Sequence, residues 1–308
     1  MCILYMAEPS SAAEWQQAFK KSAPDIELRV WPEVGDASDI HSLIAWQPLP
    51  NLMKQFPNLR VLYSAGAGVD QFDLTLLPEQ VSLVRLVDSS MADIMAEYVM
   101  FAVLALHRDL LDYQISQRER CWTPRPIIPA SERRVGVMGL GQLGQVALDR
   151  LRSLGFIMSA WNRSRKDMAP GRCYAGSDEL PSFLGQCDIV VNLLPLTTET
   201  TGILNSVTLK YLPMGAGLVN VGRGGHVVES DLLRALDEGR IGGAVLDVLS
   251  QEPPPVDHPF WQHPRVLLTP HIASNVQVGG AVDVILRNLY RERRGLPLLN
   301  VVDRFKGY

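Results

Sequence analysis

Three side chains of this 308-residue chain could act together on a carbonyl compound. Arg223 lies between glycines, Glu252 precedes three prolines and His271 follows Thr-Pro, each at or just after an apolar stretch typical of a strand. A guanidinium can bind a carboxylate with two parallel hydrogen bonds, and an imidazole held by a carboxylate can protonate a carbonyl oxygen. Because ligands of open α/β sheets bind at the carboxyl ends of the strands, the three residues together favour reduction of a 2-keto acid. Taken singly, they have structural alternatives: a loop cation, a solvated turn and a structural histidine.

A glycine-rich segment predicts a nucleotide site. Gly139-Leu140-Gly141-Gln142-Leu143-Gly144 follows an apolar stretch and opens a helical one. In this setting the glycines let the backbone approach a pyrophosphate at the helix N-terminus, where N–H groups favour anions. A tight strand-to-helix turn that binds no ligand is the alternative.

The residues after the next strand bear on the choice of cofactor. Asn162 stands where an NAD site would carry an acid for the ribose hydroxyls. The following residues offer a cationic fork, a hydroxyl and a second cation to a 2′-phosphate, and they are Arg163, Ser164 and Arg165. A solvated basic turn is the alternative. The segment therefore predicts NADPH as the preferred cofactor, with NADH possible.

These segments must be positioned by two series of alternating strands and helices. Strands are expected at 2–6, 26–31, 42–47, 60–64 and 83–87, and then at 135–138, 156–160, 188–194, 217–221, 243–248 and 266–269. Helices are expected at 11–21, 51–56, 94–111, 142–154, 178–184, 230–238 and 276–294. The pattern predicts an α/β protein of two domains. Ser90 and Asp93 have the spacing of a capping box before the helix at 94–111, which is apolar on nearly every face and must be buried.

The composition excludes several classes of protein. With 47% hydrophobic and 20% charged residues the chain is globular rather than disordered, and a net charge of −4 lacks the basic field that nucleic acid or anionic membrane attracts. Four cysteines without a CxxC pair indicate a reducing compartment and no metal site. With no apolar stretch of about 18 residues and no signal peptide, we expect a cytoplasmic protein. The remaining histidines, interpreted as surface or structural residues, are His41, His107, His226, His258 and His263.

The order of the motifs resembles that of the D-isomer-specific 2-hydroxyacid dehydrogenases over essentially the whole chain. After the glycine segment come Asn-Val-Gly-Arg-Gly at 220–224, Leu-Asp-Val at 246–248, Glu-Pro at 252–253 and Pro-His at 270–271. The segments at 65–70, 161–165, 190–195 and 302–308 are most similar to the short bacterial glyoxylate/hydroxypyruvate reductase A subgroup. The resemblance implies a Rossmann-type doubly wound parallel sheet at 99–274. It also implies a smaller flavodoxin-like substrate domain built from 1–98 and 275–308.

The resemblance also implies roles for particular residues. The catalytic residues would be Arg223, Glu252 and His271. Further cofactor contacts would come from Leu194, Pro195, Val221, Gly222, Asp247 and Ala273. Substrate contacts, besides those of Arg223 and His271, would come from Trp46, Ala65, Gly66 and Ala67. For Asp247 the alternative is a strand-end carboxylate that binds backbone N–H groups, and for Trp46 it is packing.

The expected activity is NADPH-dependent reduction of glyoxylate and hydroxypyruvate by a homodimer, with His271 as general acid. Two alternatives stay open. One is a dehydrogenase for another 2-hydroxy acid, and the other is a corepressor-like scaffold that senses its cofactor.

Overall fold

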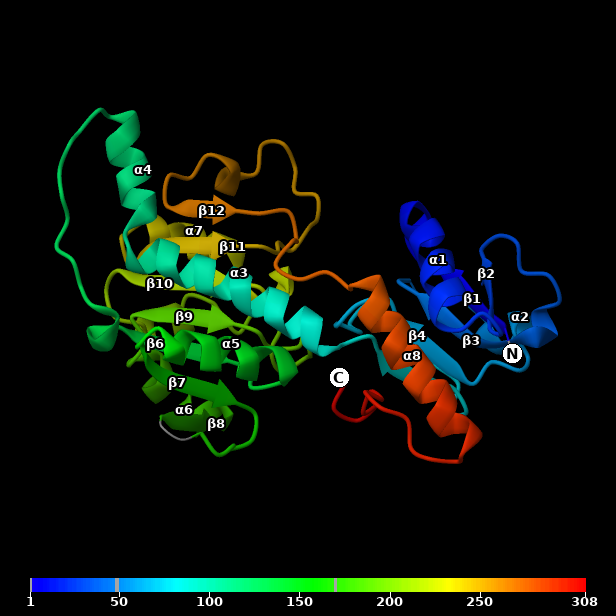
Figure 1. Ribbon diagram of the computed structural model, residues 1–308. Coiled ribbons are helices and arrows are strands. Elements are labelled where there is room, and N and C mark those ends of the chain that lie inside the picture. Colours follow the sequence, from blue (N-terminus) through cyan, green and yellow to red (C-terminus); the bar gives the residue numbers. More distant parts are fainter. Residues whose placement is uncertain (1, 48–49, 169–170) are drawn as a thin grey trace. The chain divides into compact units, whose positions relative to one another are not determined.

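The computed structural model describes residues 2–47, 50–168 and 171–308. The chain divides into two compact units (Figure 1). Unit 1 comprises Met1–Met91 and Asn275–Tyr308, and unit 2 comprises Ala92–Ser274. Each is a parallel sheet with helices on its faces, so the predicted α/β class is confirmed. The first crossing between the units falls within helix α3, earlier than the crossing expected after residue 98.

Unit 1 holds a five-stranded parallel sheet in the order β2-β1-β3-β4-β5, as in flavodoxin-like folds. Its strands are β1 (Cys2–Met6), β2 (Glu27–Val30), β3 (Ile40–Ala45), β4 (Val61–Ser64) and β5 (Ser82–Arg85). Its helices are α1 (Ala12–Ser22), α2 (Leu52–Gln55) and α8 (Val278–Arg293). Buried side chains of α1 and α8, such as Phe19 and Ile285, form one core with the sheet, and Leu52 of α2 belongs to another.

Unit 2 holds a seven-stranded parallel sheet in the order β12-β11-β10-β9-β6-β7-β8, with the reversal of strand order between β6 and β9. Its strands are β6 (Arg134–Met138), β7 (Ile157–Asn162), β8 (Arg172–Ala175), β9 (Ile189–Asn192), β10 (Ala216–Asn220), β11 (Ile241–Leu246) and β12 (Val266–Leu268). Its helices are α4 (Leu110–Arg118), α5 (Gln142–Ser153), α6 (Gly176–Leu184), α7 (Glu229–Asp237) and most of α3 (Ser89–His107).

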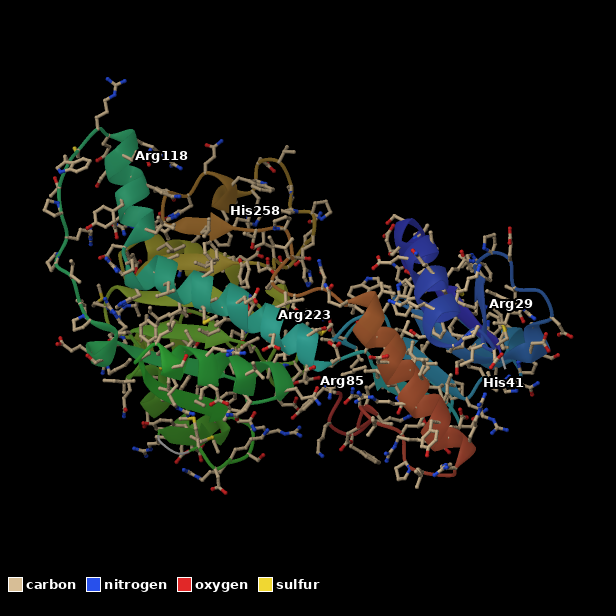
Figure 2. The ribbon with its side chains drawn as sticks, in the orientation of Figure 1. Arg29, His41, Arg85, Arg118, Arg223 and His258 are labelled. Atoms are coloured by element: carbon tan, nitrogen blue, oxygen red, sulfur yellow. The ribbon has the colours of Figure 1, made fainter. Side chains whose placement is uncertain are left out.

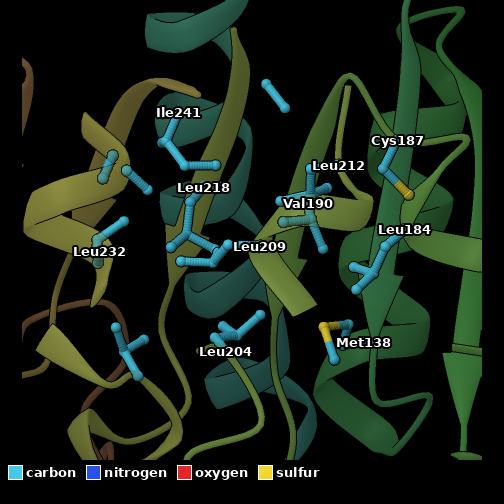
Figure 3. Packing of buried hydrophobic residues seen from close by; sticks show 14 of the residues in the cluster. Met138, Leu184, Cys187, Val190, Leu204, Leu209, Leu212, Leu218, Leu232 and Ile241 are labelled. Carbon is cyan, nitrogen blue, oxygen red and sulfur yellow. The ribbon is translucent and has the colours of Figure 1, made fainter. Parts of the chain in front are cut away.

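The sheet of unit 2 separates two hydrophobic cores. One includes Leu184 of α6, Val190 of β9 and Leu232 of α7 (Figure 3). In the second core, side chains of α3 and α5 are buried together with Val137 of β6. Such continuous burial explains why these strands could be predicted as short apolar runs. Strand β8 was not predicted, because this edge strand has only two buried residues, Cys173 and Tyr174.

Helix α3 differs from the prediction in its start and its end. Asp88, rather than Ser90, accepts the N–H of Met91 at 2.9 Å, and the hydroxyl of Ser90 donates to the same carboxylate. The predicted Ser90–Asp93 capping box is therefore wrong, because the Asp88 carboxylate accepts the free N–H of Met91 at the start of the helix. The predicted helix at 94–111 is also divided, because Asp109 adopts a left-handed conformation (φ 54°) before α4.

Helix α3 is long and apolar enough to cross a membrane by length and composition alone. Its buried side chains between Met95 and Val103, however, belong to a core of unit 2. A Cβ at Gly217 of β10 would lie 2.9 Å from the Leu106 side chain, so a strand glycine makes room for the helix. One side of α3 therefore packs as a core helix against the sheet of unit 2.

Candidate active site

The glycine loop connects β6 to α5 beside the point where the strand order reverses. Gly139 turns the chain in a left-handed conformation (φ 98°) that side chains disfavour. A Cβ at Gly144 would lie 1.9 Å from the Gly139 carbonyl oxygen, so this glycine permits close packing of helix on strand. At Gly141 a Cβ would meet no described atom within 4 Å. The loop thus leaves open space at the N-terminus of a 12-residue helix, as a pyrophosphate requires.

The segment after β7 is tied to this loop through Leu140. Asn162 Oδ1 accepts the Leu140 N–H at 3.4 Å, and Lys166 Nζ donates to the Leu140 carbonyl oxygen at 2.5 Å. The sequence analysis did not include Lys166 in the site, although it directly follows the basic segment Arg163-Ser164-Arg165. Its position places a basic side chain beside the glycine loop.

Arg165 has structural partners of its own. Its guanidinium forms an ion pair with Glu179 at 2.6 Å and donates to the Cys173 carbonyl oxygen at 3.1 Å. Glu179 also accepts the N–H of Ala175, and the hydrogen bonds to Ala175 and Arg165 hold its pKa below the usual value. Arg165 therefore helps to hold β8 and the start of α6 together.

Two buried asparagines hold the strand ends next to the glycine loop. Asn192 ends β9 and Asn220 ends β10, and Asn192 Nδ2 donates to Asn220 Oδ1 at 2.9 Å. Asn192 Oδ1 accepts the Leu194 N–H at 3.3 Å, while Asn220 Nδ2 donates to the Arg223 carbonyl oxygen at 3.0 Å. These amides shape both the Leu194–Pro195 segment and the arginine loop. Their place as the last residues of adjacent apolar strands is the sequence signal that was missed.

Arg223 lies in a tightly packed loop after β10 (Figure 2). Its Nη1 atom donates to the Gly222 carbonyl oxygen at 2.8 Å. A Cβ at Gly224 would lie 1.8 Å from the Leu249 carbonyl carbon, so the arginine loop touches the segment that leads to Glu252. The predicted residues Val221 and Gly222 belong to the same loop.

His271 and Glu252 form a hydrogen-bonded pair. His271 Nδ1 lies 2.6 Å from Glu252 Oε2, and the other carboxylate oxygen accepts the Leu249 N–H at 3.0 Å. Both side chains are about one-third exposed, at 37% and 35%. The carboxylate is thus fixed by the backbone and in turn orients the imidazole, whose Nε2 atom is on the other side of the ring from Glu252.

Asp247 holds the loop that carries His271. The side chain is 2% exposed. Its Oδ1 accepts the Ile272 N–H at 2.9 Å and its Oδ2 accepts the Ala273 N–H at 2.8 Å, while its carbonyl oxygen accepts the His271 N–H. The structure therefore gives Asp247 the backbone-binding position weighed as its alternative. These bonds hold His271 in a left-handed conformation (φ 54°) that is uncommon for a histidine.

A hydroxyl relay supports the same carboxylate. Thr269 Oγ1 donates to Asp247 Oδ1 at 2.6 Å, so the Tyr98 hydroxyl, 2.5 Å from Thr269 Oγ1, is the donor of that second bond. Burial raises the pKa of Tyr98 to about 12, although the bond to Thr269 opposes the shift. Tyr98 therefore stays protonated and able to donate at all ordinary pH values.

The three ionisable residues follow adjacent strands of unit 2. Arg223 follows β10, Glu252 follows β11 and His271 follows β12, and these strands are neighbours in the sheet. All three side chains thus come at the same carboxyl edge, as the sequence predicted. In the described part of the chain, no three His, Cys, Asp or Glu side chains gather as metal ligands would.

The predicted substrate contacts lie at the carboxyl edge of the sheet of unit 1. Trp46 follows β3, and the loop with Ala65, Gly66 and Ala67 follows β4. A Cβ at Gly66 would lie 2.7 Å from Trp46 Cζ3, so the indole packs directly on the loop backbone. The indole is nevertheless 42% exposed and presents an aromatic surface at this edge.

Comparison with known proteins places the chain in a family. Residues 100–273 match the model of the D-isomer specific 2-hydroxyacid dehydrogenase, NAD binding domain. The chain belongs to the D-isomer specific 2-hydroxyacid dehydrogenases. Membership makes it an NAD(P)-dependent oxidoreductase, which confirms the enzyme class predicted from the motifs.

Similar dehydrogenases are known over the full length. The chain is 41% identical over 314 residues to glyoxylate/hydroxypyruvate reductase A of Salmonella choleraesuis, and the match covers 100% of both proteins. A dehydrogenase of this family from Xanthobacter autotrophicus Py2, in complex with NADPH and MES, superposes with a TM-score of 0.95 at 37% identity, covering 100% of this chain and 99% of the other. The NADPH-dependent glyoxylate/hydroxypyruvate reductase of Sinorhizobium meliloti, in complex with NADP and sulfate, gives 0.91 at 34% identity, with coverage of 100% and 99%.

Proposed function

We propose that this dehydrogenase reduces glyoxylate and hydroxypyruvate to the corresponding 2-hydroxy acids, with NADPH as the preferred donor. The observation that carries the proposal is the 2.6 Å contact between His271 and Glu252, which follow β12 and β11, at the same sheet edge as Arg223 after β10. The full-length similarity to reductases named for these two substrates supports the choice of substrate.

The side chains have distinct roles in this reaction. Arg223 binds the substrate carboxylate through its guanidinium. His271 donates a proton to the carbonyl oxygen, and Glu252 keeps the imidazole oriented and stabilises its charged form. The bound nicotinamide supplies the hydride. In the reverse oxidation, His271 accepts the proton of the 2-hydroxyl group as general base.

The preference for NADPH rests on the segment after β7. Asn162 carries no charge that would repel a 2′-phosphate, and its side chain already binds the glycine loop at Leu140. We assign Arg163, Ser164 and Lys166 to the phosphate, with Arg165 in support through Glu179. The remaining cofactor contacts are those of the glycine loop, Leu194–Pro195, Val221–Gly222 and Ala273, while Asp247 holds the backbone of the His271 loop.

In this proposal, unit 2 supplies the cofactor loop, Arg223 and the acid–base pair. The four cysteines are free thiols, which suits a reducing cytoplasm.

We further propose that the protein is a homodimer. Large apolar side chains are exposed on α3, on α4 and on the segment that follows α4, and they are Phe101, Leu104, Leu110, Tyr113, Trp122, Ile127 and Ile128. Trp122 is fully exposed, and so much apolar surface on adjoining segments is typical of an interface.

Light scattering should give a dimer mass for the wild type and a monomer mass for the double variant Phe101→Glu/Leu104→Glu. Val256→Glu, a change at an exposed apolar residue elsewhere, is the control. A monomeric wild type would refute the dimer.

Loss of NADPH absorbance on addition of 2-keto acids tests the activity. Glyoxylate, hydroxypyruvate and bulkier 2-keto acids are each assayed with NADPH and with NADH. Rapid turnover of the two short acids with NADPH is expected. Turnover of only a bulkier acid would show that the substrate is another 2-keto acid. Tight NADPH binding without any turnover would favour the cofactor-sensing scaffold.

A further inference from the structure

His226 is fully buried beside the arginine loop, where sequence reasoning interpreted it as a surface or structural residue. Its Nδ1 atom accepts the Arg223 N–H at 3.0 Å, and its Nε2 atom lies 3.1 Å from the Pro195 carbonyl oxygen. The Arg223 carbonyl oxygen, 3.1 Å from the same Nδ1, takes its hydrogen bond from Asn220 instead.

These partners define the state of the ring. A backbone N–H can only donate, so Nδ1 is an acceptor and carries no proton. The ring proton is then on Nε2, from which it is donated to the Pro195 carbonyl oxygen. His226 is therefore held as one neutral tautomer that binds a donor on one side and an acceptor on the other.

We propose that His226 is a positioning residue that ties the carboxylate-binding arginine to the segment that covers the nicotinamide. The inference rests on the proposed roles of Arg223 and of Leu194–Pro195. Through one imidazole, the backbone of Arg223 is linked to the carbonyl group of Pro195, so the two binding segments share a rigid connection.

The surroundings are built around this ring. A Cβ at Gly222 would lie 3.0 Å from His226 Nδ1 and 3.0 Å from Asn192 Nδ2, so the glycine makes room for both polar side chains. The Pro195 carbonyl oxygen also accepts the Thr200 hydroxyl at 2.7 Å. Asn192 and Asn220 join the same two strand ends by a second route. An apolar side chain of similar size would fill the space without making either connection.

Two substitutions separate the two connections. In His226→Asn, an amide oxygen can replace Nδ1 and keep the bond to Arg223, while the link to Pro195 is lost. In His226→Gln, the longer side chain can place its NH2 group near the position of Nε2 and keep the bond to Pro195, while the link to Arg223 is lost. His226→Leu removes both connections.

Steady-state KM for glyoxylate and the Kd for NADPH, from fluorescence titration, are the readouts. We expect His226→Gln to raise the KM for glyoxylate and His226→Asn to raise the Kd for NADPH, each by about three- to tenfold, the value of one hydrogen bond. His226→Leu should raise both. A change that is equal in the Asn and Gln variants, or a lowered melting temperature with both constants unchanged, would overturn the proposal.

Two controls make the outcome specific. His258, in the same unit, binds Glu229 outside this network, so His258→Asn and His258→Gln should leave both constants unchanged. Arg223→Gln tests the underlying role separately. If that variant keeps the wild-type KM for glyoxylate, the assignment of Arg223 fails. If the KM rises but the His226 variants behave alike, only the positioning role fails. Should His226→Leu not fold, the Asn and Gln pair still decides.

Discussion

His271 Nδ1 and Glu252 Oε2 lie 2.6 Å apart, and the Leu249 N–H fixes the other oxygen of the same carboxylate. We predict that His271→Ala lowers kcat by about 10²–10⁴-fold, the usual value of a general acid. Glu252→Gln should lower kcat less, because the neutral amide stabilises the charged imidazole less than the carboxylate does. The Kd for NADPH should stay unchanged in both, and a His271→Ala enzyme with near-normal turnover would reject the mechanism.

Substitutions at two glycines of the nucleotide loop should both weaken NADPH binding but differ in their effect on stability. Gly144→Ala places a Cβ against the Gly139 carbonyl oxygen, so it should lower the melting temperature as well as NADPH binding. Gly141→Ala meets open space and has an ordinary φ of −73°, so the fold should be retained while the added methyl group obstructs the pyrophosphate. Thermal unfolding and NADPH titration of both variants check this. Wild-type NADPH affinity in Gly141→Ala would contradict the assignment of the loop.

The basic residues after β7 should divide into binding and supporting groups. Arg163→Ala and Lys166→Ala should each reduce the ratio of NADPH to NADH affinity by about tenfold, the value of a charge-assisted hydrogen bond. Arg165→Ala should instead act mainly on stability, because it breaks the pair with Glu179. Titration with both cofactors, together with urea unfolding, measures the two effects. An unchanged ratio of NADPH to NADH affinity in Arg163→Ala and Lys166→Ala would refute the assignment of these residues to the 2′-phosphate.

Asp247 should be required for the loop that presents His271. Asp247→Ala removes acceptors from the N–H groups of Ile272 and Ala273 and should lower the free energy of unfolding by about 2–3 kcal/mol. It should also lower kcat, since His271 loses its fixed position. Asp257→Asn, at an exposed residue, is the control for a lost aspartate charge. Full stability in Asp247→Ala, measured by urea unfolding, would refute this role.

His107 should make stability depend on pH. Burial, with smaller contributions from Arg133 and Arg108, lowers the pKa of His107 below its ordinary value. Its ring packs edge-on against Phe156, and its buried Nδ1 has no hydrogen-bond partner among the described residues. Because the unfolded chain binds the proton more readily, stability should fall as the pH drops through about 6.5.

Urea unfolding midpoints measured across that pH range check the prediction for His107. His107→Phe, which does not titrate, should show a smaller dependence on pH. His41→Gln alters a histidine outside the core, so it should retain the wild-type dependence. An unchanged slope in His107→Phe would show that other groups cause the dependence.

Much of the fold could be predicted because its signals are local. Strand β1 was predicted at its observed bounds, and the helix at 142–154 differs from α5 by one residue at its end. Strand β8 was missed because it is short, has only two buried residues and forms by pairing with β7 at the sheet edge. The start of α3 was misplaced because Ser90 and Asp88 both offer acceptors, and only the observed geometry distinguishes them.

The sequence by itself determined the order of the motifs, the α/β class and the identity of the three ionisable residues at strand ends. These depend on periodicity and on neighbours along the chain. Only the tertiary structure decided which polar side chains hold the site together: Asn192 with Asn220, Asp247 with the His271 loop, and His226 between Arg223 and Pro195. The physical reason is that the Asn192–Asn220, Asp247–Ala273 and His226–Pro195 bonds each join different strand ends. Sheet order, rather than distance along the chain, brings those ends within hydrogen-bonding reach.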